Sequence, residues 1–116
     1  MKLIEFLQEH AQPIELFERV SASSRHLADG SGAAHVYCVY FSPGGKIGEH
    51  RAGFGQLFLG IHGAGWATGE DGRRVELSAG QGVYFERGEL HSKGSETGMA
   101  AIMVQVAELE PYAEAD

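Results

Sequence analysis

The chain has 116 residues, of which 43% are hydrophobic and 22% are charged, and its formal net charge is −7. This length and composition are typical of one folded domain and exclude an intrinsically disordered chain. An acidic chain without clusters of Lys and Arg is a poor partner for a phosphate backbone, so we expect no nucleic-acid ligand. The short, mixed N-terminal stretch predicts neither a signal peptide nor a membrane span, and we expect a cytoplasmic location.

The N-terminal third contains short segments of uncertain type. Residues 3–7 fit either one helical turn or a short strand, and residues 14–17 fit a short strand after Pro13. Residues 34–42 are apolar at successive positions and rich in Val, Tyr and Phe, which predicts a central strand covered on both faces. The single cysteine, Cys38, lies in this run and is expected to be a buried structural residue.

The rest of the chain alternates short apolar segments with turns. Asp71-Gly72 is a strong hairpin signal between residues 65–68 and 73–77. Such spacing of turns predicts an all-β sandwich or barrel in a single domain. Further strands are expected at residues 46–51, 56–62, 83–85 and 99–106. We divide the chain into an arm with the first strands over residues 1–33, a barrel over residues 34–107 and an acidic tail over residues 108–116.

Two spaced patterns run through the predicted barrel. The first contains Gly44, His50, Gln56 and Gly63, and the second contains Gly80, Gly88 and His91. These patterns resemble the two motifs of the cupin family. The first motif has a Gly, five residues, a His, one residue, a second His, a short gap, a Glu, six residues and a Gly. The second has a Gly, five residues, a Pro, one residue, a Gly, two residues and a His.

The chain departs from these motifs at three positions. Ala52 stands where the second His belongs, Gln56 replaces the Glu, and Glu86 replaces the Pro. The resemblance implies a single antiparallel double-stranded β-helix, also called a jelly-roll barrel, with residues 3–7 as either a short helix or an edge strand. Members of the family commonly form homodimers, and we expect one here.

The resemblance also implies a site inside the barrel. His50, Gln56 and His91 would be the remaining ligands of a divalent transition metal, Fe, Mn, Ni or Zn. Replacing Glu by Gln removes the anionic ligand, so the attraction for a cation is weakened. The alternative is a metal-free cavity in which two imidazoles and an amide form hydrogen bonds with a bound small molecule.

Four further residues are candidates for the same cavity. His62 and His35 either point into the barrel or lie at its rim and surface. Phe58 either belongs to the core alone or also walls an apolar pocket. Glu89, two residues before His91, is either a general acid, a support for His91, or an exposed carboxylate in a turn.

Three functions are consistent with these residues. The first is a barrel that binds a small molecule without strong catalytic activity. The second is a metal-dependent dioxygenase or isomerase that uses His50, Gln56 and His91. The third is a homodimer in which residues 3–17 cover an edge strand of the neighbouring copy.

Overall fold

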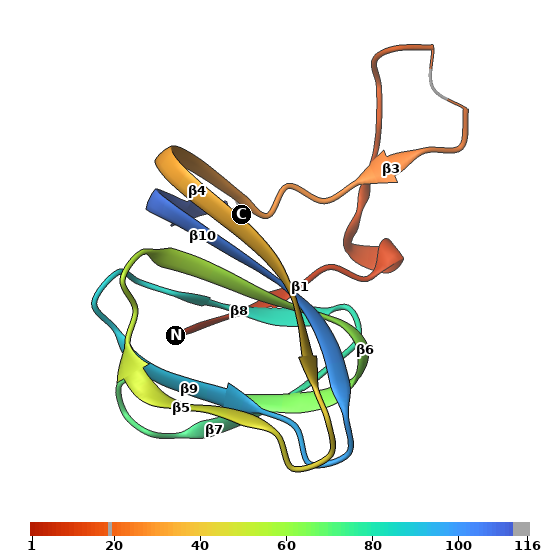
Figure 1. The fold of residues 1–116 in the computed structure, drawn as a ribbon. Helices are drawn as coiled ribbons and strands as arrows, with labels where there is room; N and C mark the ends of the chain where they lie inside the picture. The colour runs from red at the N-terminus through yellow and green to blue at the C-terminus, as the bar shows by residue number, and fades with distance from the viewer. Residues whose placement is uncertain (19, 113–116) are drawn as a thin grey trace.

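The computed structural model describes residues 1–18 and 20–112, and these residues form an all-β structure (Figure 1). The only helical element in this part of the chain is the short 3-10 turn η1 (Gln8–His10). None of its helices is long and apolar enough to cross a membrane. The strands are β1 (Lys2–Glu5), β2 (Gln12–Pro13), β3 (Ser23–Ser24), β4 (Ala28–Phe41), β5 (Lys46–Arg51), β6 (Gly55–Thr68), β7 (Arg74–Ser78), β8 (Gln81–Phe85), β9 (Leu90–Gly94) and β10 (Met99–Pro111).

The strands close into a barrel in which β6 belongs to both walls. Its first half lies between β8 and β10 in a sheet of order β1-β8-β6-β10-β4. Its second half pairs with β7 and with β9, which in turn pairs with β5. All of these pairings are antiparallel. The predicted double-stranded β-helix is confirmed, and so is the hairpin at Asp71-Gly72 between β6 and β7.

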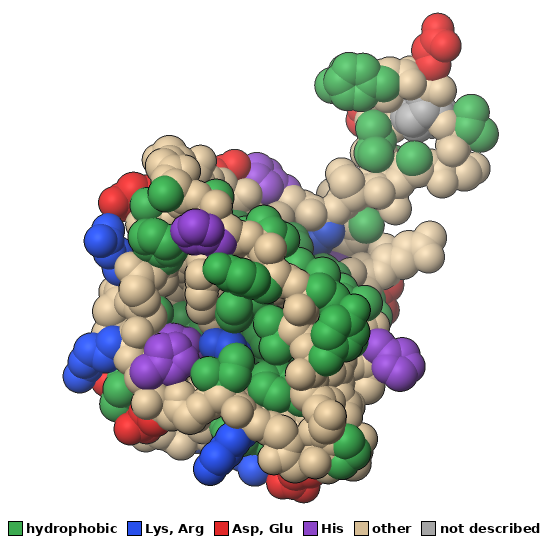
Figure 2. Space-filling model, viewed as in Figure 1, with side chains coloured by type: hydrophobic (Ala, Val, Ile, Leu, Met, Phe, Trp, Pro, Cys, Tyr) green, Lys and Arg blue, Asp and Glu red, His purple; other side chains and the backbone are tan. Residues whose placement is uncertain are grey.

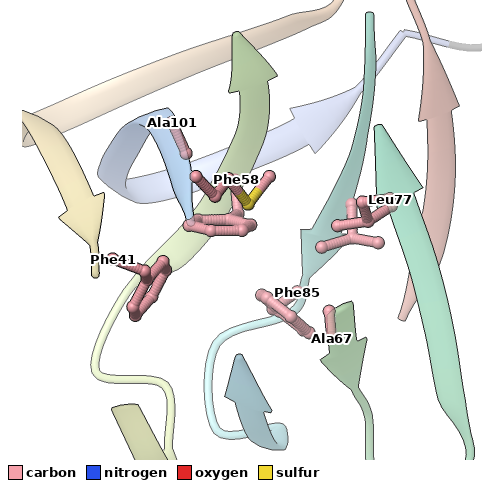
Figure 3. Close-up of a cluster of buried hydrophobic side chains, with 8 residues drawn as sticks. Phe41, Phe58, Ala67, Leu77, Phe85 and Ala101 are labelled. Carbon is pink, nitrogen blue, oxygen red and sulfur yellow. The ribbon is translucent and has the colours of Figure 1, made fainter. Parts of the chain in front are cut away.

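The core lies between the walls of the barrel (Figure 3). Side chains at alternate strand positions point inward, and the largest of these, Phe58 and Phe85, are fully buried. The Phe41 ring meets the edge of the Phe58 ring, with the ring centroids 6.2 Å apart. The other buried members of this cluster are Ala67, Leu77, Val83, Met99 and Ala101. A second cluster, on the outer face of the sheet, contains Ile4, Leu57, Leu59, Val106 and Leu109.

The N-terminal segment differs from the expectation in part. Residues 2–5 form strand β1 on the edge of β8, which resolves the choice between helix and strand. Residues 14–17, expected as a strand, instead lie between the short strands β2 and β3. These two strands pair with each other and form an arm, described over residues 12–18 and 20–24, that projects away from the barrel (Figure 1).

The apolar segment predicted as a central strand is an edge strand, which corrects the expectation. Strand β4 lies at the end of the sheet order, and among the described residues it pairs only with β10. Its residues 29–38 are all exposed, including Cys38, so Cys38 is not buried either. The apolar pattern had indicated cover on both faces, but among the described residues only Val39 and Phe41, at the end of this apolar run, pack against the core.

The C-terminal boundary also differs. Strand β10 continues to Pro111, and Leu109 is buried in the outer cluster. Residues 108–111 therefore belong to the sheet rather than to a tail. The end of the predicted tail, residues 113–116, lies outside the described residues.

Candidate functional site

Two of the predicted site residues are direct neighbours. His50 on β5 and His91 on β9 face each other across the strand pair, with ring centroids 4.4 Å apart. The Nδ1 atom of His50 lies 2.8 Å from the Gly48 carbonyl oxygen, and Nδ1 of His91 lies 3.1 Å from the Glu89 carbonyl oxygen. A carbonyl oxygen only accepts, so each Nδ1 carries a proton, and in the neutral ring Nε2 is then an acceptor.

The third predicted residue, Gln56, is held by a lysine. Lys93 on β9 donates a hydrogen bond from Nζ to Oε1 of Gln56 on β6, at 2.7 Å. Lys93 and Gln56 are buried, with relative exposures of 1% and 3%. The ammonium also lies 5.5 Å from the centre of the Phe58 ring and 5.4 Å from that of Phe85. Gln56 and two aromatic faces therefore surround a cation inside the barrel.

Burial changes the acid–base behaviour of this pair of β9 residues. Desolvation lowers the pKa of Lys93 to about 8. Desolvation, and then the charge of Lys93, lower the pKa of His91 to about 4. At neutral pH His91 is therefore neutral, and Lys93 is mostly an ammonium with a deprotonated fraction on the order of a tenth.

His91 has an unmet hydrogen-bonding capacity. Its Nε2 is buried and has no hydrogen-bond partner among the described residues. An unpartnered buried polar atom costs about 1–3 kcal/mol and is rare in folded proteins. The centroid of the His91 ring lies 4.4 Å from that of Phe85 and 4.4 Å from that of His50, which is exposed.

The barrel is open to solvent above this group. Figure 2 shows a hollow on the face of the molecule that carries β5 and β9, with a histidine and a basic side chain on its lower wall. His91 and Lys93 have almost no exposed surface, whereas the neighbouring His50 is exposed.

The residues present do not fit a resident transition metal. Such sites need three or four protein donors around the ion. Here the two Nε2 atoms are suitable, but Ala52 offers no donor and the Gln56 oxygen is engaged by an ammonium. A divalent cation bound beside it would be repelled by Lys93. No group of three His, Cys, Asp or Glu side chains in the described part of the chain is arranged to hold a metal ion.

Of the two additional histidines, His62 lies outside the barrel, because strand β6 is bulged. Residues 60 and 62 pair with consecutive residues of β10, which leaves Ile61 as an extra residue in β6. A bulge reverses the alternation of faces, so His62 does not share the inward face of Gln56. Of the two alternatives given for His62, the structure therefore favours the one at the rim and surface of the barrel.

His35 shares the inner face with Gln56 but lies apart from the site. Both residues pair with Gln105, on opposite sides of β10, so two strand spacings of about 4.8 Å each separate their backbones. The His35 ring is exposed and stacks on Phe54, with ring centroids 5.7 Å apart.

Phe58 and Glu89 both contribute to the site, Phe58 through its ring and Glu89 through its backbone rather than its carboxylate. Phe58 is part of the core and at the same time the wall beside Lys93. The carboxylate of Glu89 accepts hydrogen bonds from the Glu86 backbone and the Met1 amino group, so it serves the turn. The backbone carbonyl of Glu89, not its carboxylate, orients His91.

Sequence reasoning missed Lys93. Strand β9 reads Leu-His-Ser-Lys-Gly, which lacks the β-branched and aromatic residues that mark a strand. A strand there would have placed Lys93 on the face of His91, because residues two apart share a face. The usable signal was therefore the position of the lysine two residues after the motif histidine.

Comparison with known proteins supports the fold and leaves the activity open. No protein-family model matches the chain. Among curated proteins, the (R)-mandelonitrile lyase of Granulicella tundricola is 35% identical over 69 residues, which cover 58% of this chain and 53% of the lyase. The match thus spans about half the length of that enzyme.

Solved structures give a broader match. A cupin-like protein of Thermotoga maritima superimposes with a TM-score of 0.62 at 20% identity, covering 89% of this chain and 92% of that one. A cupin superfamily protein of Desulfitobacterium hafniense gives a TM-score of 0.62 at 15% identity, covering 93% and 100%. The chain therefore has the cupin fold.

Proposed function

We propose that this barrel binds, without a metal, a small organic molecule that carries a hydroxyl group next to a carboxylate, carbonyl or nitrile. The observation that supports the proposal is the pair formed by the unpartnered Nε2 of His91 and the buried ammonium of Lys93. A ligand hydroxyl would donate to Nε2, and an adjacent oxygen or nitrogen would accept from Nζ.

The pair is suited to such a ligand for two reasons. Lys93 has three N–H donors, and Gln56 takes one of them, so donors remain for a ligand. Phe58 and Phe85 keep water away from the ammonium, which strengthens a hydrogen bond to it. The cupin fold by itself does not specify a ligand, so the proposal depends on this pair.

A binding experiment tests the proposal directly. Mandelate serves as the probe, titrated into ¹⁵N-labelled protein and followed by the amide resonances of β9. Lys93→Met should weaken binding about tenfold to a hundredfold, since a hydrogen bond to a charged group contributes about 1.5–3 kcal/mol. The matched control is Lys46→Met, which removes an exposed lysine from the neighbouring strand β5. Equal affinity in the two variants would refute a role for Lys93.

The absence of a resident metal is tested separately. Protein purified without a nickel column is analysed by plasma mass spectrometry, before and after incubation with Fe, Mn, Ni or Zn salts. We expect far less than one metal atom per chain in every sample. One tightly held metal per chain, lost in His91→Phe, would restore the metal-dependent alternative.

Cleavage of an α-hydroxynitrile is a second candidate function, favoured by the likeness to the (R)-mandelonitrile lyase. Neutral His91 would accept the hydroxyl proton as the bond to the nitrile carbon breaks. Cyanide would leave with the bonding electrons, its negative charge stabilised by Lys93, and would then take up the proton. The assay is benzaldehyde release from mandelonitrile, and loss of release in both Lys93→Met and His91→Phe is expected. Unchanged release in either variant would refute this mechanism.

A further inference from the structure

The site contains an amine that the proposed function uses only as a hydrogen-bond donor. Lys93 has 1% of its surface exposed, and its Nζ atom bonds to the uncharged amide oxygen of Gln56 at 2.7 Å. Among the described residues no carboxylate forms an ion pair with Lys93, and burial lowers its pKa to about 8. A lysine held in an apolar site without an acidic partner is a typical nucleophile toward a carbonyl carbon.

The two other lysines of the chain provide a contrast within the same molecule. Lys2 lies on the edge strand β1 and Lys46 begins β5, and both are exposed. Water stabilises an exposed ammonium, so almost none of it is free amine at neutral pH. At Lys93 the rings of Phe58 and Phe85 lie 5.5 Å and 5.4 Å from Nζ and replace that water. Of the three lysines, Lys93 is therefore the one that loses its proton most readily.

The groups around the amine are suited to an addition reaction. His91 lies two residues before Lys93 on the same face of β9, and its buried Nε2 has no hydrogen-bond partner among the described residues. When an amine adds to a carbonyl group, the carbonyl oxygen becomes a hydroxyl group, which can donate to such an acceptor. The exposed His50 on β5 adjoins His91, and the remaining neighbours of the amine are the Gln56 amide and two phenylalanine rings.

We infer that Lys93 captures an aldehyde from the hollow of Figure 2 by forming an imine with it. The Nζ lone pair of the free amine attacks the carbonyl carbon, the π electrons of the C=O bond move to oxygen, and one N–H proton passes to that oxygen. The new hydroxyl group donates to Nε2 of His91. It then leaves with the second N–H proton as water, and the nitrogen lone pair completes the C=N bond.

The packing around the amine selects the class of carbonyl compound. An aldehyde carbon carries one hydrogen and one larger substituent, whereas a ketone carbon carries two larger substituents. An amine between two aromatic rings has room for the smaller group, and an aryl substituent would lie against those rings. The inference goes beyond the proposed function, because an aldehyde needs no hydroxyl group and its bond to Lys93 is covalent.

Reductive trapping tests the inference. Native protein is incubated at neutral pH with benzaldehyde and sodium cyanoborohydride, which delivers hydride to the imine carbon and leaves a benzylamine. Mass spectrometry of peptides then locates the benzyl group. Lys93 should carry it at least about tenfold more often than Lys2 or Lys46, because a larger share of Lys93 is free amine. Equal or weaker labelling of Lys93 would overturn the inference.

Two controls connect the labelling to the folded site. In concentrated urea the three lysines should react alike, and a preference for Lys93 that persists there would overturn the inference. Lys93→Arg keeps a positive charge but has no amine that forms an imine, so labelling of the intact protein should fall about tenfold, with unchanged circular dichroism. The matched Lys46→Arg should be labelled like the wild type, and labelling that falls equally in both variants would overturn the inference.

The wild-type protein separates this inference from the proposed function. Labelling of Lys93 without mandelate binding would refute the proposed function and leave the imine standing. Mandelate binding without labelling of Lys93 would refute the imine and leave the proposed function standing.

Discussion

Replacing Lys93 by Met gives the most direct test of the buried ammonium. Burial lowers the pKa of Lys93 from 10.5 to about 8, which corresponds to about 3 kcal/mol of destabilisation while the amine is protonated in both states. Between these pH values the unfolded chain binds the proton and the folded chain does not. The contribution of Lys93 to the free energy of unfolding therefore rises with pH in this window.

The comparison of wild type with Lys93→Met isolates this effect, because the other titrating groups are common to both proteins. The variant also leaves Oε1 of Gln56 without its donor, a cost of about 1–3 kcal/mol that does not depend on pH in this range. From about pH 7.5 to about pH 10, the difference in stability should therefore move by about 2–3 kcal/mol in favour of the wild type.

Urea unfolding followed by Trp66 fluorescence measures this difference at each pH. Lys46→Met is again the control, and its difference from the wild type should stay constant to within about 0.5 kcal/mol. A constant difference between wild type and Lys93→Met would show that the amine is solvated in the folded protein. The site as described here would then be wrong.

Three further outcomes are expected. As pH falls from 6.5 to about 4, the free energy of unfolding of the wild type should fall by up to about 3 kcal/mol relative to that of His91→Phe. The reason is that His91 is neutral in the folded protein and takes up a proton on unfolding. A difference in unfolding free energy that stays constant with pH in urea would contradict this. Phe58→Ala, which empties the centre of the core, should cost about 3–5 kcal/mol in urea unfolding, and a cost below 1 kcal/mol would show that the core is wrongly assigned. His50→Ala should preserve or strengthen mandelate binding because the ring only lies beside His91, whereas lost binding would identify His50 as a ligand-binding residue.

The spacing of the motifs predicted where the histidines of the site lie, but not the chemical groups around them. The spacing of His50 and His91 indicated that two imidazoles converge in the barrel, and the structure places them opposite each other on β5 and β9. It could not identify the partner of Gln56, because that partner lies on a strand without a strand-like sequence. A family motif contains only the positions that family members share, so it gave no information about a lysine outside those positions.

Two other differences have local physical causes. The alternation of inward and outward side chains along β6 is interrupted at Ile61. One extra residue there reverses the face of every later residue, and sequence patterns do not mark where a bulge occurs. The apolar run of β4 correctly indicated a strand. Hydrophobicity alone, however, does not show whether a strand lies in the middle of a sheet or at its edge, and β4 lies at the edge.

The continuity of β6 across both walls also sets an order in which the barrel forms. The β6–β7 hairpin needs only a short connection, so it can form early, whereas β10 joins β6 across more than thirty intervening residues. Until β10 arrives, the side of the barrel that carries Met103 and Ala101 is missing and the Phe58 ring is uncovered. Because β10 follows β9 in the chain, Lys93 is synthesised before the strand that covers Phe58, one of the two rings beside its ammonium.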